Sequence, residues 1–145
     1  MSSADPFVPP QSIAEWATRI RLLADELRSL SSEEFFDPSS HNYHNCMRHF
    51  GRLLHSVSLD PEIDQNADAF GNFVRAYPQT NGWLPQNSAE LSRMELSEVL
   101  YRIWRNNSDG RWVSGALVSA FKCGSLVAAL DRLAGEADRL PIVIR

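Results

Sequence analysis

Residues 109–133 read DGRWVSGALVSAFKCGSLVAALDRL, and this stretch decides the predicted fold because it describes two short helices folded about a turn. The first helix is expected from Arg111 to Lys122, with apolar side chains over about half of its circumference. Gly124 suits the left-handed residue that ends a helix, and Ser125 suits the cap of the next one. Apolar positions then return the second helix to the core: Leu126, Val127, Leu130 and Leu133.

A helical hairpin of this kind resembles the helix-turn-helix of DNA-binding proteins, in which the second helix reads base edges. Between Ser125 and Ala134 the only basic residue is Arg132, and Asp131 offsets its charge. Such a helix lacks the array of Arg, Lys, Asn and Gln side chains that base readout requires. We therefore expect the hairpin to be a structural part of the core, with DNA recognition as the less favoured alternative.

The remainder of the chain continues the helical pattern. Ser12 and Glu15 form a capping-box pair, and apolar residues at steps of three and four follow as far as Leu30. A second helix start follows at Ser31–Glu34. We expect an amphipathic helix over about Ser40–Val57 and further helices between Asp60 and Trp104. We predict an all-α fold, a compact orthogonal bundle of about six helices, in which a flexible arm (1–11) precedes one helical domain (12–140) and a short extended tail (141–145) follows it.

Composition narrows the class of protein. The chain has 145 residues, 43% hydrophobic and 22% charged, with a net charge of −4 and two cysteines far apart. These values are typical of a globular domain, and the mild negative charge gives no general attraction to nucleic acid. The sequence contains neither a secretory leader nor an apolar run of membrane-spanning length, so we expect a cytoplasmic protein with free thiols and no membrane association.

The second half of the chain also resembles a known group of sequences. The segment Arg111–Leu133, with ELSEVLYRIWR before it and FVRAYPQTNGW further upstream, is similar to the closing motif of an uncharacterised bacterial family of unknown-function domains. The resemblance covers about the second half and implies a small helical bacterial protein. It implies no catalytic residue.

All four histidines and one cysteine lie in HNYHNCMRHFGRLLH, residues 41–55. On a helical wheel His41 and His44 share a face, whereas Cys46 points to the apolar side. Zinc needs three or four ligands around one point, so we expect no native metal site here. A second interpretation is an anion-binding surface, because Arg48 and Arg52 lie one turn apart with His44 and His55 flanking them. A merely solvated polar face is the plainer alternative.

Motifs for catalysis are few. The sequence has no phosphate-binding glycine loop, dinucleotide fingerprint, zinc-protease motif or nucleophile elbow, so we expect no cofactor. Carboxylate pairs such as Asp25–Glu26 and Glu33–Glu34 indicate helix starts or outer faces.

Taken together, these patterns favour a non-enzymatic regulatory or interaction module that binds another protein. The expected binding residues are His44, Arg48, Arg52, His55 and Trp83, the last in the loop Pro78–Gln86. The alternatives are a nucleic-acid-binding protein and, third, an enzyme that uses the histidines.

Overall fold

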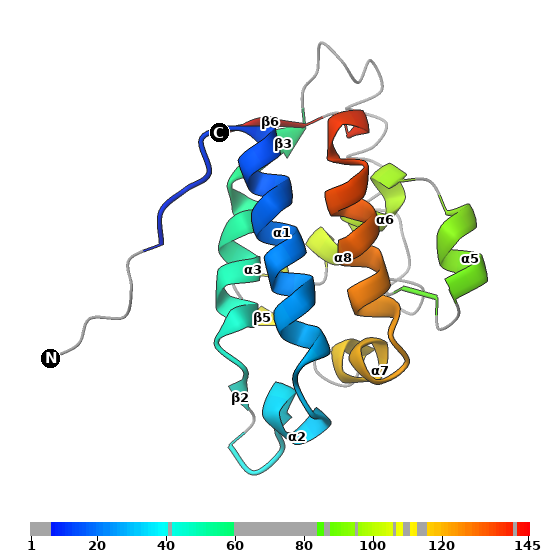
Figure 1. Ribbon diagram of the computed structural model, residues 1–145. Coiled ribbons are helices and arrows are strands. Elements are labelled where there is room, and N and C mark those ends of the chain that lie inside the picture. Colours follow the sequence, from blue (N-terminus) through cyan, green and yellow to red (C-terminus); the bar gives the residue numbers. More distant parts are fainter. Residues whose placement is uncertain are drawn as a thin grey trace, which may run out of the picture.

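The computed structural model (Figure 1) describes residues 7–40, 42–59, 84–85, 88–94, 96–105, 107–108, 111–112, 116–140 and 142–145. Within these residues the protein is mostly helical. The helices are α1 (Ile13–Arg28), α2 (Ser32–Phe35), α3 (Cys46–His55), α5 (Ser88–Arg93), α6 (Leu96–Arg105), α7 (Ala116–Lys122) and α8 (Ser125–Gly135), with a 3-10 turn at Ala137–Arg139.

The C-terminal helix α8 forms the centre of the fold. It packs against α1, α5, α6 and α7, and its most extensive contact is with α1 (Figure 1). Among its residues, Leu126, Ala129, Leu130 and Leu133 are fully buried. Val127, Ala128, Asp131 and Arg132 are half-buried, so the outer side of α8 offers solvent only a narrow strip.

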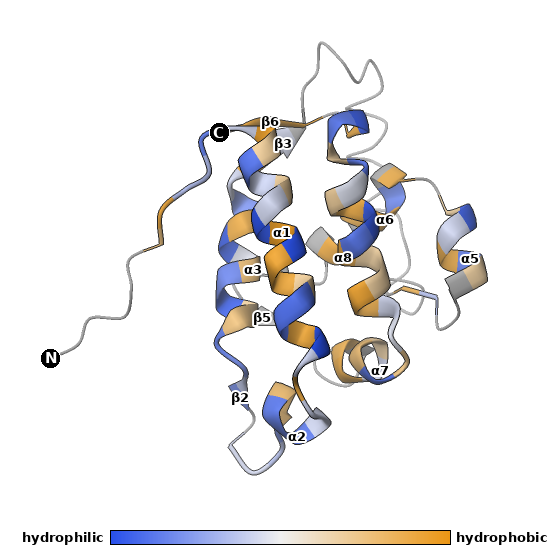
Figure 2. Cartoon of the chain, viewed as in Figure 1, coloured by the Kyte–Doolittle hydropathy of each residue, from blue (hydrophilic) through white to orange (hydrophobic). Residues whose placement is uncertain are grey.

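Helix α1 begins where its sequence predicts and ends at Arg28, two residues before Leu30. The predicted capping box is half formed, because the Glu15 carboxylate bonds to Gln11 in place of Ser12. The Ser12 side chain accepts a hydrogen bond from the Glu15 backbone N–H, while the Glu15 carboxylate accepts one from the N–H of Gln11. The apolar face of α1 is buried, and Figure 2 shows apolar and polar bands alternating along α1 and α3. These bands are what two amphipathic helices produce when each covers one side of a shared core.

The α7–α8 turn is confirmed in part. Gly124 has φ of +86°, the left-handed conformation predicted for it. Ser125 is not a cap, because it is the first residue of α8 and its buried hydroxyl donates to the Pro85 carbonyl. The preceding helix is also shorter than predicted: α7 begins at Ala116, and Arg111–Trp112 forms strand β5 instead.

Three short antiparallel strand pairs depart from the all-α prediction. β1 (Phe36–Asp37) pairs with β2 (Asn42–Tyr43), β4 (Asn107–Ser108) pairs with β5, and β3 (Val57–Leu59) pairs with β6 (Ile142–Ile144). The predicted helix over Ser40–Val57 was therefore too long at both ends, because strands occupy its first and last residues. The tail from residue 142 is extended as predicted and is held by the β3–β6 ladder.

The two charged residues of α8, Asp131 and Arg132, are used within the fold. The Arg132 guanidinium donates hydrogen bonds to the carbonyls of Leu91 and Met94 at 2.8 and 2.5 Å. These bonds give partners to carbonyl groups at the C-terminal end of α5, which the helix itself leaves unpaired. Asp131 forms an ion pair with Arg28 of α1. Among the described helices, none is long and apolar enough to cross a membrane.

Candidate functional site

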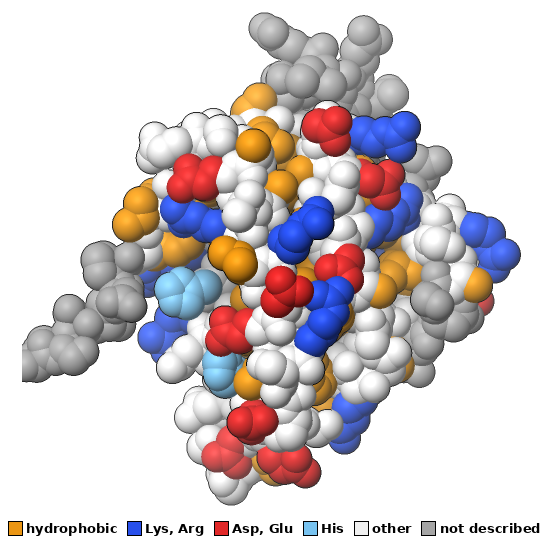
Figure 3. All heavy atoms as spheres, viewed as in Figure 1, with side chains coloured by type: hydrophobic (Ala, Val, Ile, Leu, Met, Phe, Trp, Pro, Cys, Tyr) orange, Lys and Arg blue, Asp and Glu red, His pale blue; other side chains and the backbone are white. Residues whose placement is uncertain are grey.

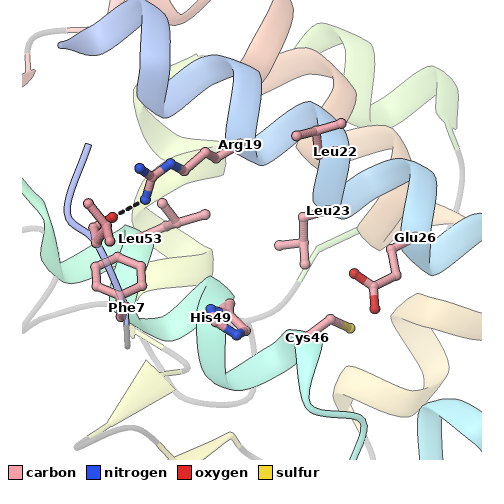
Figure 4. Close-up of a pocket in the computed structure, with 9 residues that line it drawn as sticks. Phe7, Arg19, Leu22, Leu23, Glu26, Cys46, His49 and Leu53 are labelled. Atoms are coloured by element: carbon pink, nitrogen blue, oxygen red, sulfur yellow. Dashed lines mark hydrogen bonds between the residues drawn. The ribbon is translucent and has the colours of Figure 1, made fainter. Parts of the chain in front are cut away.

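A groove of about 320 Å³ lies between α1 and α3, beside the segment that leads into α1 (Figure 4). From α1 come Arg19, Leu22, Leu23 and Glu26; from α3 come Cys46, His49 and Leu53; and Phe7 and Val8 line it from the leading segment. Most of the lining is apolar, and polar side chains stand at its two ends. This distribution is typical of a small binding site, in which apolar walls surround a few polar groups.

Phe7 and Val8 are held against the groove by arginine. The Arg19 guanidinium donates to the Val8 carbonyl and, at 2.8 Å, to the Glu15 carboxylate. The guanidinium carbons of Arg19 and Arg52 lie 5.9 and 5.7 Å from the centre of the Phe7 ring. Both distances fall within the range of cation–π attraction, so Phe7 joins the two helices at this end of the groove.

At the opposite end, Glu26, His44 and Cys46 come together. The His44 Nδ1 atom lies 3.7 Å from a Glu26 carboxylate oxygen. One ligand atom from each residue, namely the carboxylate oxygen, the imidazole nitrogen and Cys46 Sγ, lies within 4.8 Å of the other two. Cys46 is 3% exposed, whereas the side chains of His44 and Glu26 are 31% and 49% exposed. The cluster thus has a buried sulfur and a partly solvated rim.

The local backbone explains why His44 reaches this position. Helix α3 begins at Cys46, and Asn45 at its N-cap makes no side-chain capping bond. The first backbone N–H groups of a helix lack partners within the helix, and the Cys46 N–H donates to His44 Nδ1 at 3.1 Å. The His44 ring therefore replaces the missing cap, and it is held over the first turn of α3.

The buried Cys46 thiol is unreactive in this environment. Burial, and secondly the negative charge of Glu26, raises the pKa of the Cys46 thiol to about 12. A thiol with so high a pKa is almost wholly protonated at neutral pH and is a poor nucleophile. Cys46 is therefore unsuited to act as a free catalytic thiolate.

The outer face of α3 is basic. Arg48, His49, Arg52 and His55 are all exposed, and the segment Cys46–His55 contains no acidic residue. Among the described residues, neither Arg48 nor Arg52 forms an ion pair, whereas Arg19, Arg28, Arg102, Arg132 and Arg139 each do. Figure 3 shows histidine and basic side chains gathered at the α3 edge, with acidic side chains running down the neighbouring face toward α2.

The binding residues predicted from sequence are divided by the structure. Arg48, Arg52 and His55 lie on the exposed side of α3, whereas His44 precedes the helix and lies beside Glu26. Trp83 and His41 lie outside the described residues. The predicted pairing of His41 with His44 on one face therefore also lies outside them.

Sequence reasoning missed the Glu26–His44–Cys46 cluster for two reasons. The helical wheel placed His44 and Cys46 on different sides, but residues 42–45 are not helical, so the wheel does not apply to His44. Glu26 belongs to another helix and was interpreted as part of an outer face. Two metal-binding residue types two positions apart were the only local signal.

Comparisons of the chain with protein-family models, with curated proteins and with solved structures find no match. The resemblance of the second half to a bacterial family of unknown function therefore stays a prediction.

Proposed function

We propose that this chain is a non-enzymatic cytoplasmic interaction module, a compact orthogonal helical bundle that binds an acidic segment of another protein along the exposed face of α3 and the adjoining groove. The observation that carries the proposal is the pair Arg48 and Arg52. Both are exposed, and within the described part of the chain neither has a carboxylate partner.

Arginine guanidinium groups bind carboxylates through two parallel N–H···O bonds, which is the strongest contact that an exposed basic side chain offers. Arg48 and Arg52 are four residues apart on α3, so they lie about one turn, or 6 Å, apart. A partner with two acidic side chains at similar spacing would meet both. Since the whole chain carries a net charge of −4, the attraction is local to this face.

The groove beside α3 supplies the apolar part of the surface. Val8 and Leu22 line it and are 58% and 62% exposed. Apolar side chains left open to water next to unpaired charges are typical of an interface with an apolar centre and a polar rim. A partner segment that alternates acidic and large apolar residues would complement both features.

Nucleic acid binding by a helix-turn-helix receives less support. Most side chains of α8 are buried or half-buried, and its two charged residues, Arg132 and Asp131, are engaged with α5 and α1. The third interpretation, an enzyme that uses the histidines, receives no help from Cys46, whose raised pKa removes it as a nucleophile.

The proposal is tested by fluorescence anisotropy with a labelled amphipathic peptide of alternating Glu and Leu residues and with its Gln counterpart. We expect the acidic peptide to bind more tightly than its Gln counterpart. The double variant Arg48→Gln with Arg52→Gln should weaken binding of the acidic peptide by at least about tenfold, because each lost hydrogen bond to a charged group is worth about 1.5–3 kcal/mol. The matched control is Arg21→Gln with Arg93→Gln, which removes the same charge from exposed positions on α1 and α5.

Two outcomes would overturn the proposal. One is equal weakening in the control variant, which would indicate nonspecific attraction to positive charge. The other is tighter, salt-dependent binding to a mixed-sequence DNA duplex that is lost in the Arg48/Arg52 variant, which would favour the nucleic-acid alternative.

A further inference from the structure

We propose that Glu26 of α1, His44 and Cys46 of α3 form a three-ligand site for a divalent transition-metal ion, with zinc as the best match, and that the fourth coordination position opens toward the groove. This inference goes beyond the proposed partner binding. It uses neither Arg48 nor Arg52, so each of the two proposals can fail without the other.

The distances suit a tetrahedral ion. Zinc binds sulfur at about 2.3 Å and nitrogen or oxygen at about 2.0–2.2 Å, so the ligand atoms of a tetrahedral site are separated from one another by about 3.3–3.8 Å. The Nδ1 atom of His44 already lies 3.7 Å from the Glu26 oxygen. The remaining separations are at most 4.8 Å, and side-chain rotation of the partly exposed Glu26 and His44 can shorten them.

The kinds of ligand atom also agree with this class of metal. A thiolate, an imidazole and a carboxylate together favour zinc and its neighbours in the transition series over magnesium or calcium, which prefer oxygen alone. When the ion binds, the Cys46 Sγ–H bond breaks, the Sγ–Zn bond forms and the proton passes to solvent. The His44 Nδ1 atom then binds the metal in place of the Cys46 N–H.

The electrostatic environment is complementary to a cation. Glu26 places a carboxylate beside a nearly fully buried sulfur, an arrangement that disfavours the thiolate when no ion is present. A divalent cation between the two groups reverses this effect, since a coordinating thiol is deprotonated outright. Glu26 thus becomes a second ligand beside Cys46 once the ion is bound.

The groove defines the open position. Glu26 and Cys46 both line it, and Figure 4 shows the carboxylate and the sulfur close to one another at one end of the groove. Three protein ligands and one open position are typical of zinc sites that bind water or an exogenous ligand, whereas closed structural sites use four protein ligands. The fourth ligand is therefore water or an anionic group that enters through the groove.

The test is titration of the full chain, produced without a histidine tag, with Zn²⁺ by calorimetry and with Co²⁺ by absorption spectroscopy. We expect one ion per chain. The cobalt form should show thiolate-to-metal charge transfer in the near ultraviolet together with the intense visible bands of a four-coordinate ion. Glu26→Gln and His44→Gln should each weaken Zn²⁺ binding by more than about tenfold, because loss of even an outer-shell partner costs that much.

Cys46→Ser separates the sulfur ligand from the other two: it should abolish the charge-transfer band, whereas Glu26→Gln should keep the band at higher metal concentration. Because Cys46 is buried, circular dichroism checks that this variant folds. Glu26 and His44 are partly exposed, so their variants keep the test valid if Cys46→Ser does not fold. The matched controls, Cys123→Ser and His55→Gln, alter exposed residues outside the cluster and should leave the affinity unchanged. Zinc binding that survives both Glu26→Gln and His44→Gln, or a cobalt complex without sulfur charge transfer, would overturn the proposal.

Discussion

The indole Nε1 of Trp16 donates a 2.8 Å hydrogen bond to the backbone carbonyl of Leu53. Trp16 lies in α1 and is fully buried, and Leu53 lies near the end of α3. The same carbonyl accepts the Ser56 N–H at 3.1 Å. One side chain therefore fixes α1 against α3, the two helices that form the groove.

Trp16→Phe should lower the free energy of unfolding by about 1–3 kcal/mol, because it removes a hydrogen bond worth about 1 kcal/mol and leaves space where the larger ring stood. Urea denaturation measures the change. Leu22→Ala is the control: Leu22 lies on the same helix but is 62% exposed, so we expect a change of less than about 0.5 kcal/mol. Equal midpoints for the wild type and Trp16→Phe would contradict the prediction.

Gly124→Ala should destabilise the protein by about 1–2 kcal/mol, since an alanine pays the steric cost of the left-handed conformation. An added Cβ would meet no atom within 4 Å, so backbone strain alone accounts for the loss. Gly135→Ala is the matched substitution at the other end of α8, where the nearest atom to the new Cβ is Arg21 Nη2 at 3.9 Å. There we expect a neutral or stabilising effect of up to about 1 kcal/mol. A similar loss at both sites would contradict the assignment of the Gly124 cost to its positive φ.

Iodoacetamide at about pH 8 should label Cys123 and spare Cys46 in the native protein without metal. Cys123 is exposed, while burial and Glu26 raise the pKa of Cys46 to about 12, so only about one Cys46 thiol in ten thousand is ionised at that pH. Mass spectrometry of the labelled peptides measures this ratio. Glu26→Gln removes only the smaller cause of the shift, so labelling of Cys46 should rise modestly. Equal labelling of the two cysteines before unfolding would refute this explanation.

Glu34→Gln should change how stability depends on pH. Hydrogen bonds from the Ser31 backbone N–H and then its side chain hold the pKa of Glu34 below its usual 4.5. A lowered folded-state pKa stabilises the protein above the unfolded pKa, and this contribution is lost as pH falls through the folded value. The variant should be less stable than the wild type at neutral pH, and the two should converge in acid. The difference in urea denaturation midpoint between the variant and the wild type, measured from about pH 7 to about pH 3, tests this expectation. Glu33→Gln leaves the capping box intact and should track the wild type throughout.

Local chemistry explains which parts of the fold could be predicted from sequence. The cap at Ser12, the apolar face of α1 and the left-handed Gly124 each depend on residues within a few positions of one another. The strand pairs do not. Val57–Leu59 pairs with Ile142–Ile144 across more than eighty residues, and three residues are too few to show the alternation of a strand.

The candidate site likewise contains parts that depend on neighbouring residues and parts that depend on residues far apart in sequence. The exposed arginines of α3 could be predicted because they lie on one helix and obey its period. Glu26 and Cys46 meet only because Trp16 and the apolar face of α1 place that helix beside α3. The position of His44 depends on the start of α3 at Cys46, because His44 lies in the loop before the helix. If α3 began one turn earlier, His44 would be helical and its imidazole would point away from Glu26 and Cys46.

The central position of α8 has a consequence for biosynthesis. Helix α1 emerges from the ribosome first, but its main packing partner begins at Ser125, about a hundred residues later. At about 5–20 residues per second, roughly 5–20 seconds pass before α8 can cover its share of the apolar face of α1, and of the two partners α3 and α8 only α3 is available earlier. The nascent chain is therefore open to chaperones during that interval, because the α1–α8 contact cannot form before α8 has left the exit tunnel.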